Sequence, residues 1–131
     1  IRESLAGIMD EADMSLIEEV IAELNKSKFD QWIDLHNLRM VKYGSMLHID
    51  CHLTVPWYIN VNEAHACVDS FSNIIQNKFG NSVEFFVHTD GCMPFSCPIC
   101  MVKDCQHRKQ VFQQKLEWNL ENVISNNKHQ L

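Results

Sequence analysis

Apolar residues recur at two different spacings along the first ninety residues, and each spacing predicts one kind of element. Spacings of three and four residues, as in Ile17, Val20 and Leu24, are typical of the buried face of a helix. Strict alternation, as over 46–55, is typical of a strand with one face in the core. These patterns predict, in order, a helix over 14–27, strands over 33–43 and 46–55, a helix over 63–79 and a strand over 82–88.

Polar residues and glycines mark the expected ends of these elements. Asp13 and Asn62 are expected N-caps of the two helices, because their side chains can accept hydrogen bonds from free backbone N–H groups. Gly80 is expected to end the second helix. Gly44 belongs to a turn that joins the first two strands into a hairpin. A short lead-in helix or turn is expected over 5–9.

The order of the elements predicts the fold class. Three strands with helices on one face form a two-layer α+β domain. A Cys-rich loop over 91–106 follows, and then a last helix over 107–125 and a polar, frayed tail from Asn126. The second face of such a sheet stays uncovered, and dimerisation is a common way to cover it.

Composition narrows the classes of function. The 131 residues are 46% hydrophobic and carry a net charge of −6, which suits one domain with a substantial core. Phosphate binding needs clustered lysine and arginine, so the acidic balance argues against nucleic acid as a partner. The sequence has no apolar run of about 18 residues, the length that spans a bilayer, and no visible signal peptide. Because the chain opens at Ile1, we expect a fragment of a longer protein.

Histidines and one carboxylate recur in segments that the expected fold brings together. The candidate ligands are His36, His52, His65, His88 and Asp90. His88 and Asp90 are two residues apart in a strand, so they point the same way. Imidazole with carboxylate suits Zn²⁺ or a similar divalent ion, and a bridging carboxylate would hold two ions a few Å apart. The alternative is that these are scattered surface histidines. His48 and His129 are given no special role.

Four of the six cysteines fall within fourteen residues and form a second candidate site. The cluster consists of Cys92, Cys97, Cys100 and Cys105, followed by His107. A Cys-x2-Cys pair presents two thiolates to one tetrahedral ion, and two flanking cysteines, or one cysteine and His107, would complete the site. Such a site would have a structural role. The alternatives to a metal site are disulfides and unliganded thiols. With a good core and no secretory signal, reduced thiols in the cytosol are expected, with Cys51 and Cys67 in the core.

No enzyme activity is predicted. The sequence lacks the P-loop, zinc-protease and serine-hydrolase motifs. No cysteine lies on a strand-to-helix turn beside an oriented base. Two alternatives stay open: a hydrolytic zinc site, and a soluble zinc-finger-type protein-interaction module that uses only the cysteine cluster.

With these residues in view, the segment 34–90 resembles the cytoplasmic C-terminal domain of cation diffusion facilitator (cation efflux) transporters. The stretches that carry the resemblance are "DLHNLRMVKYG", "LHIDCHLTV", "NVNEAHACVDSFSNII" and "VEFFVHTDG". The stretch "SLAGIMDEADMSLIEEVIAEL" resembles the segment that follows the last membrane helix in that family. Gly91 stands where many relatives have proline, and the region from Cys92 onward exceeds the common core.

The resemblance implies a ferredoxin-like, metallochaperone-like αββαβ fold and a homodimer that binds divalent cations near its interface. It implies a lead-in over 1–13 that follows the membrane domain, a metal-binding dimerisation domain over 14–90, and an additional Cys-rich loop and helix over 91–131. The family's ligand positions fall on His36, His52, His65, His88 and Asp90, with Asp90 as the bridging residue.

The implied function is that of a cytosolic regulatory domain, at the cytoplasmic face of a membrane, in an exchanger that exports Zn²⁺ or a similar ion against protons. The implied partners are a covalently linked transmembrane domain, a second copy of the chain and divalent metal ions. Because imidazoles bind metal in their neutral form, metal binding should weaken below about pH 6.5.

Overall fold

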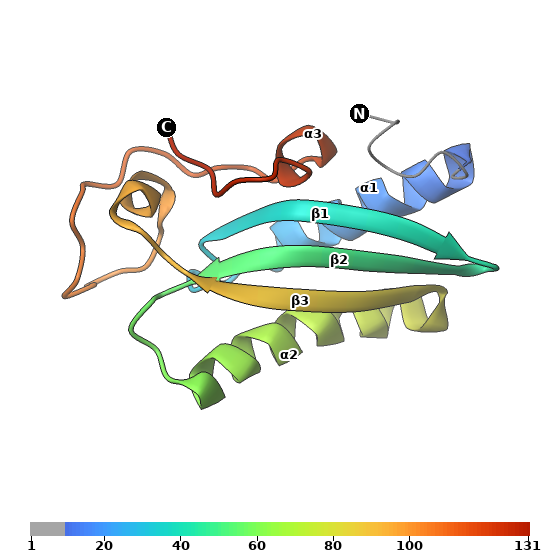
Figure 1. Cartoon of the computed structure of the whole chain (residues 1–131), viewed down its shortest axis with the longest axis horizontal. Coiled ribbons are helices and arrows are strands. Elements are labelled where there is room, and N and C mark those ends of the chain that lie inside the picture. Colours follow the sequence, from blue (N-terminus) through green and yellow to red (C-terminus); the bar gives the residue numbers. More distant parts are fainter. Residues whose placement is uncertain (1–9) are drawn as a thin grey trace.

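Three strands and two long helices form two layers in the computed structural model, which describes residues 10–131 (Figure 1). The helices and strands are α1 (Glu11–Lys26), β1 (Asp34–Tyr43), β2 (Met46–Val55), α2 (Val61–Phe79), β3 (Val83–Gly91) and α3 (Leu120–Val123), with short 3₁₀ turns η2 (Gly80–Ser82) and η3 (Pro94–Ile99). The expected element over 5–9 lies outside the described residues. The predicted α+β class and element order are confirmed.

The sheet is mixed, with the strand order β1-β2-β3. Strands β1 and β2 form the expected antiparallel hairpin, and Gly44 in its turn has a φ of 59°, a conformation that glycine adopts without strain. Strand β3 lies parallel to β2. A parallel neighbour requires a crossover, which α2 supplies.

Both long helices begin earlier than the sequence analysis expected, because the capping residues differ. Asp10 caps α1: its side chain accepts from the Asp13 backbone N–H, and the Asp13 side chain accepts from that of Asp10. Asn60 and Glu63 form the same reciprocal pair at the start of α2. The predicted N-caps, Asp13 and Asn62, were therefore wrong. The helices begin at the reciprocal pairs instead, because each pair satisfies two free backbone N–H groups.

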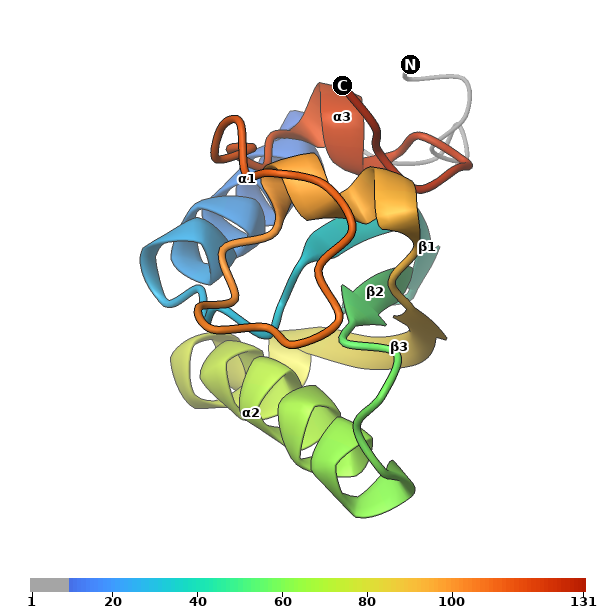
Figure 2. The same cartoon turned by 90° about the vertical axis from the view of Figure 1, so that its left-hand side faces the viewer.

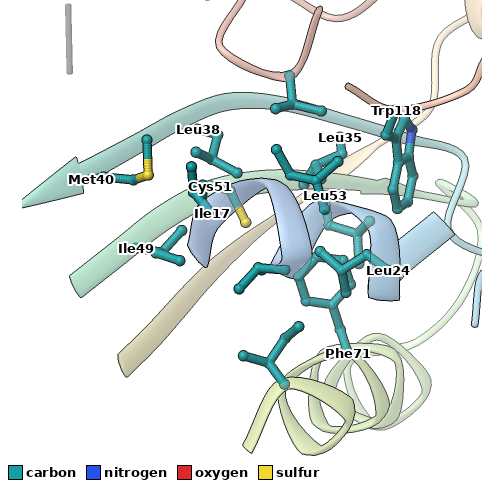
Figure 3. Close-up of a cluster of buried hydrophobic side chains, with 14 of the residues drawn as sticks. Ile17, Leu24, Leu35, Leu38, Met40, Ile49, Cys51, Leu53, Phe71 and Trp118 are labelled. Atoms are coloured by element: carbon teal, nitrogen blue, oxygen red, sulfur yellow. The ribbon is translucent and has the colours of Figure 1, made fainter. Parts of the chain in front are cut away.

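Helices α1 and α2 cover the same face of the sheet, as the end-on view in Figure 2 shows. The alternating residues of β2 pack into this layer as predicted, together with one face of α1 (Figure 3). From α2 only Phe71 and Ile75 are fully buried. The opposite face of the sheet is the outer face of the domain, and it carries the polar residues of the three strands.

The long helix expected over 107–125 is wrong in its extent. Residues 107–119 are non-helical, and within the predicted range only Leu120–Val123 forms a helix, α3. Backbone amides of this segment bond to distant partners instead: Gln113 and Gln114 donate to the Pro98 carbonyl, and Trp118 donates to the Asn25 side chain. Trp118 is 2% exposed, so its burial anchors an extended path that replaces the helix.

The C-terminal tail is packed against β1 rather than frayed. The backbone N–H of Asn37 donates to the Ser125 carbonyl at 2.6 Å. The guanidinium of Arg39 donates to the Ile124 carbonyl and to the Asn126 side chain. In the part of the chain that the structure describes, no helix combines the length and apolar character that crossing a membrane requires.

Candidate metal centre

Strand register places three histidines in one row across the outer face of the sheet. His36 on β1 is paired with His52 on β2, and His52 is paired with His88 on β3. The ring centroids of His36 and His52 are 5.3 Å apart, and those of His52 and His88 are 5.0 Å apart. The register of the three strands thus brings together histidines that are far apart in the sequence.

Asp90 completes a compact ligand group with two of these histidines. Its Oδ2 lies 3.2 Å from His36 Nε2 and 3.1 Å from His52 Nδ1. Among residues 10–131, one ligand atom from each of His36, His52 and Asp90 can be chosen so that all three lie within 4.8 Å of one another. Two imidazoles and one carboxylate form a donor set that suits Zn²⁺ and similar ions.

A bulge in β1 sets the orientation of this part of the strand. The pairing with β2 shifts between His36 and Arg39, and Asn37 adopts a φ of 51°. The extra residues let His36 lie on the outer face while Leu38 is fully buried in the core. Arg39 is paired again with Asp50, so the outer-face pattern resumes beyond the bulge.

Burial favours the neutral form of the His36 imidazole. His36 is 4% exposed, and this desolvation lowers its pKa, against the opposing effect of Asp34 and Asp90. Its Nδ1 has no hydrogen-bond partner among the described residues, although Asp34 Oδ2 lies 3.9 Å away. A neutral ring with an available nitrogen is the form that binds a metal ion.

His88 lies beside this group and is paired with a second carboxylate. His88 Nε2 is 3.2 Å from Asp50 Oδ1, and Asp50 Oδ2 is 3.5 Å from His48 Nε2. A cavity of about 230 Å³ opens here. It is lined by Asn37, Arg39, Asp50, Cys51, His52 and His88. His48, to which the sequence analysis gave no role, therefore belongs to a polar network that adjoins the site.

His65 lies apart from the other expected ligands within this chain. It is exposed on α2, and its Nε2 is 3.3 Å from the Asp69 carboxylate one helical turn away. Of the five positions that the family resemblance implied, the structure gathers His36, His52 and Asp90, places His88 next to them, and leaves His65 outside the group.

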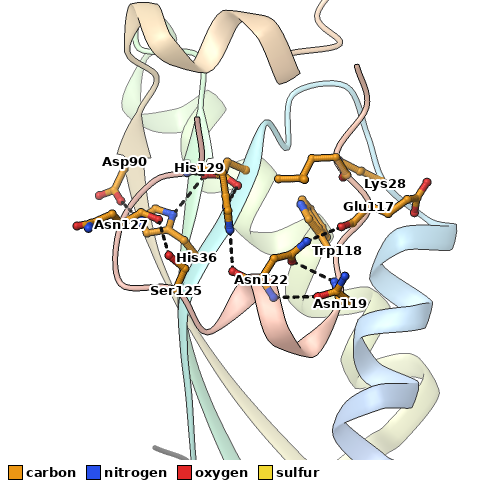
Figure 4. A network of polar contacts seen from close by, with 12 residues as sticks. Lys28, His36, Asp90, Glu117, Trp118, Asn119, Asn122, Ser125, Asn127 and His129 are labelled. Carbon is orange, nitrogen blue, oxygen red and sulfur yellow. Dashed lines mark hydrogen bonds and ion pairs between the residues drawn. The ribbon is translucent and has the colours of Figure 1, made fainter. Parts of the chain in front are cut away.

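The C-terminal tail reaches the edge of the ligand group, as Figure 4 shows for His129 beside His36 and Asp90. Lys128 Nζ lies 3.8 Å from Asp90 Oδ2. His129 Nδ1 lies 2.6 Å from Asp34 Oδ1, and this hydrogen bond raises the pKa of His129. Sequence analysis missed both contacts, because a polar tail without periodicity gives no sign of where it packs.

The cysteine cluster gathers around a separate cavity at the end of the sheet. Its four cysteines and His107 all line one space of about 240 Å³. Among residues 10–131 the loop cysteines are not part of a close metal-ligand group such as that of His36, His52 and Asp90. The His107 ring packs against Trp57 and Tyr58, at centroid distances of 5.0 and 4.4 Å. All six cysteines are free in the structure.

Known structures include domains with a similar fold. The chain is similar over 60% of its length to CzrB, a candidate zinc transporter, with 20% identity, a TM-score of 0.54 and 95% of that chain covered. It is also similar over 63% of its length to the metal-bound C-terminal domain of the CzcD transporter from Thermotoga maritima, with 15% identity, a TM-score of 0.55 and 94% covered. At these identities the likeness shows the fold alone. The comparison with curated proteins finds no match.

The sequence itself establishes the family. Residues 9–92 match the family described as the cytoplasmic domain of cation efflux proteins. This span includes α1, the whole sheet and every member of the ligand group. The chain therefore belongs to the cation efflux protein family and carries its cytoplasmic domain.

Proposed function

We propose that this domain binds Zn²⁺ or a similar divalent ion through His36, His52 and Asp90, and that this binding regulates the attached transporter. The observation that carries the proposal is the approach of three ligand atoms, from three strands, to within 4.8 Å. Each protomer supplies three ligands to an ion that prefers four, so a further ligand has to come from His88, water or a second copy.

A second copy of the chain is the proposed partner of the outer sheet face. Exposed Val41, Tyr43 and Phe86 accompany the polar residues on this face, and both long helices lie on the other. Covering the face would remove these apolar side chains from water. An ion that binds the compact dimer in preference to the monomer shifts the population toward the dimer.

The proposed role is regulatory and not enzymatic. Metal in the cytosol would fill the His/Asp group, favour the dimer and so alter the conformation of a membrane domain that exports the ion against protons. The neighbouring His88–Asp50 pair supports a second ion site in the same outer-face network. The proposal assigns Asp90 the central position, because its Oδ2 lies near both His36 and His52.

Zinc titration by calorimetry tests the site. Replacing two ligands together, His36→Ala with Asp90→Ala, should weaken binding at this site by at least about tenfold, since neither a nitrogen nor a carboxylate remains in their place. His65→Ala is the matched control, because it removes an exposed histidine outside the group. Unchanged affinity and stoichiometry in the double variant would refute the proposed site.

A further inference from the structure

We propose that this domain holds a second metal site, in which Cys92, Cys97, Cys100 and Cys105 bind one soft or borderline divalent ion such as Zn²⁺ or Cd²⁺. This site is independent of the His/Asp group on the outer face. Three of its four cysteines, Cys97, Cys100 and Cys105, lie beyond the family match, which ends at residue 92.

The first support is convergence in space. The four cysteines come from the end of β3, from η3 and from the turns that follow it, yet all line one cavity of about 240 Å³. The backbone N–H of Cys92 donates to the Val55 carbonyl at 2.9 Å, which fixes the start of the loop to the sheet. A loop of this length brings four thiols together only when it folds back on itself.

The second support is the local structure of the Cys-x2-Cys pair. The backbone N–H of Cys100 donates to the Cys97 carbonyl at 3.1 Å, so the two cysteines lie on one tight turn. The backbone N–H of Lys109 lies 3.4 Å from Cys97 Sγ, and the Tyr58 hydroxyl lies 3.4 Å from Cys105 Sγ. Donors directed at sulfur stabilise thiolates and orient them as ligands.

The third support is the charge around the cavity. Four thiolates on a divalent ion carry a net charge of −2, and this charge needs positive neighbours. Arg108 and Lys109 both line the cavity. The Arg108 guanidinium donates to the carbonyls of Cys97 and Cys100 at 2.8 Å, so its charge is held within the loop that carries the thiols.

Metal binding at this site is coupled to the loss of protons from the four thiols. When an ion binds, each coordinating sulfur releases its proton to solvent and the ion takes the place of the proton.

Binding requires the loop to tighten. Zn–S bonds of about 2.3 Å place tetrahedral sulfurs about 3.8 Å apart, and the cysteines of the described loop do not yet form such a close ligand group. Tightening at Cys92 would act on the end of β3, two residues from Asp90. His107 is not required as a ligand, because four thiolates complete a tetrahedral site.

The test is a Cd²⁺ titration of the reduced 131-residue chain, followed by the ultraviolet charge-transfer band of cadmium thiolates. The wild-type band should saturate at one ion per chain, and Cys97→Ser with Cys100→Ser should abolish it. Cys67→Ser is the matched control, since this half-buried thiol lies on α2 away from the loop. The band should also survive His36→Ala with Asp90→Ala, which separates this site from the proposed regulatory one.

A second measurement on the wild-type chain covers the case in which the double serine variant fails to fold. Cd²⁺ should slow alkylation of the four loop cysteines at least tenfold, as mapped by mass spectrometry, while the rate at Cys67 stays the same. Absence of the charge-transfer band in the wild type, its persistence in the folded double variant, or equal alkylation rates with and without Cd²⁺ would each overturn the proposal.

Discussion

Two basic residues of the tail contact the carboxylates on either side of His36. Lys128 lies near Asp90, and His129 is hydrogen-bonded to the buried Asp34. Both contacts place positive charge, or a group that can carry it, at the edge of the proposed ion site. The two residues act differently, because one competes with a metal ion for its ligand and the other holds the tail in place.

Removal of the Lys128 charge should strengthen metal binding. Its ammonium lies 3.8 Å from Asp90 Oδ2, and an ion that binds Asp90 has to overcome this interaction. A partly exposed ion pair contributes about 0.5 kcal/mol. Lys128→Ala should therefore raise Zn²⁺ affinity by a small factor of about two to three, measured by calorimetry. Lys115→Ala, which affects a lysine paired with Glu117, serves as the control. A weaker affinity in Lys128→Ala would contradict competition.

The His129–Asp34 hydrogen bond should stabilise the fold mainly at low pH. Because the folded state raises the pKa of His129, this stabilisation is fully present below the unfolded pKa of about 6.5 and is lost as the pH rises through the folded pKa. His129→Ala should lower the free energy of unfolding by about 1–3 kcal/mol at pH 6, and by less at pH 8.5. Urea titrations with a chelator present measure both values, with His65→Ala as control. A cost that does not decrease with pH would refute this assignment.

At the residue scale, the sequence indicated which residue types could bind metal, but not where every one of them lies. His36, His52 and Asp90 could be predicted as ligands, since the strand positions and the family resemblance agree. The separation of His65 could not be foreseen, because a position in the first turn of a helix does not fix the direction of its side chain. The bulge after His36 also gave no periodic signal.

At the element scale, Arg108 organises the loop that replaced the expected helix. Its guanidinium donates to the carbonyls of Cys97, Cys100 and Val102. The segment over 107–119 stays extended, because its backbone and side chains form hydrogen bonds with the loop and with α1 instead of within a helix. The spacing of apolar residues predicted a helix here, but tertiary hydrogen bonds favour the extended conformation that the structure shows.

Loss of the Arg108 side chain should therefore loosen the loop. Arg108→Ala leaves the three carbonyls without this donor, at an expected cost of about 1–3 kcal/mol. Amide hydrogen exchange should accelerate in the loop over 97–105, while exchange in β2 changes little. Lys109→Ala is the matched control, because only the backbone of that residue bonds to Cys97. Equal exchange rates in the two variants would count against the role of Arg108.

At the scale of the whole molecule, the two faces of the sheet differ: the inner face packs in the core, and the outer face carries the ligand group. The hydrophobic pattern predicted the inner face, since β2 alternates and α1 has one continuous apolar side. The outer face combines histidines and carboxylates with the exposed Phe86, a mixture typical of a surface that contacts another protein. The proposed partner of this face is a second copy of the chain. This expectation came from the uncovered sheet face together with the family resemblance, because the strand pattern alone does not identify what covers the face.

The proposed dimer can be tested at Phe86, which is 54% exposed and whose ring lies 5.0 Å from that of His48. Phe86→Glu would place a carboxylate in the apolar part of the contact, near Glu84, and burying it there is unfavourable. The dimer dissociation constant should rise at least about tenfold, a loss of about 1.4 kcal/mol, while the thermal midpoint of the monomer stays nearly constant. Analytical ultracentrifugation with and without Zn²⁺ measures both the dimer and its dependence on metal.

The matched control for this experiment is Val61→Glu, which adds the same charge at a residue that is 84% exposed at the start of α2. If the outer face forms the dimer, Val61→Glu should associate like the wild type, and Zn²⁺ should shift only the wild type and this control toward the dimer. Wild-type association by Phe86→Glu, or dissociation by Val61→Glu, would place the interface elsewhere. A metal-dependent dimer would then have to form without the His/Asp face, and the proposed link between ion binding and dimerisation would fail.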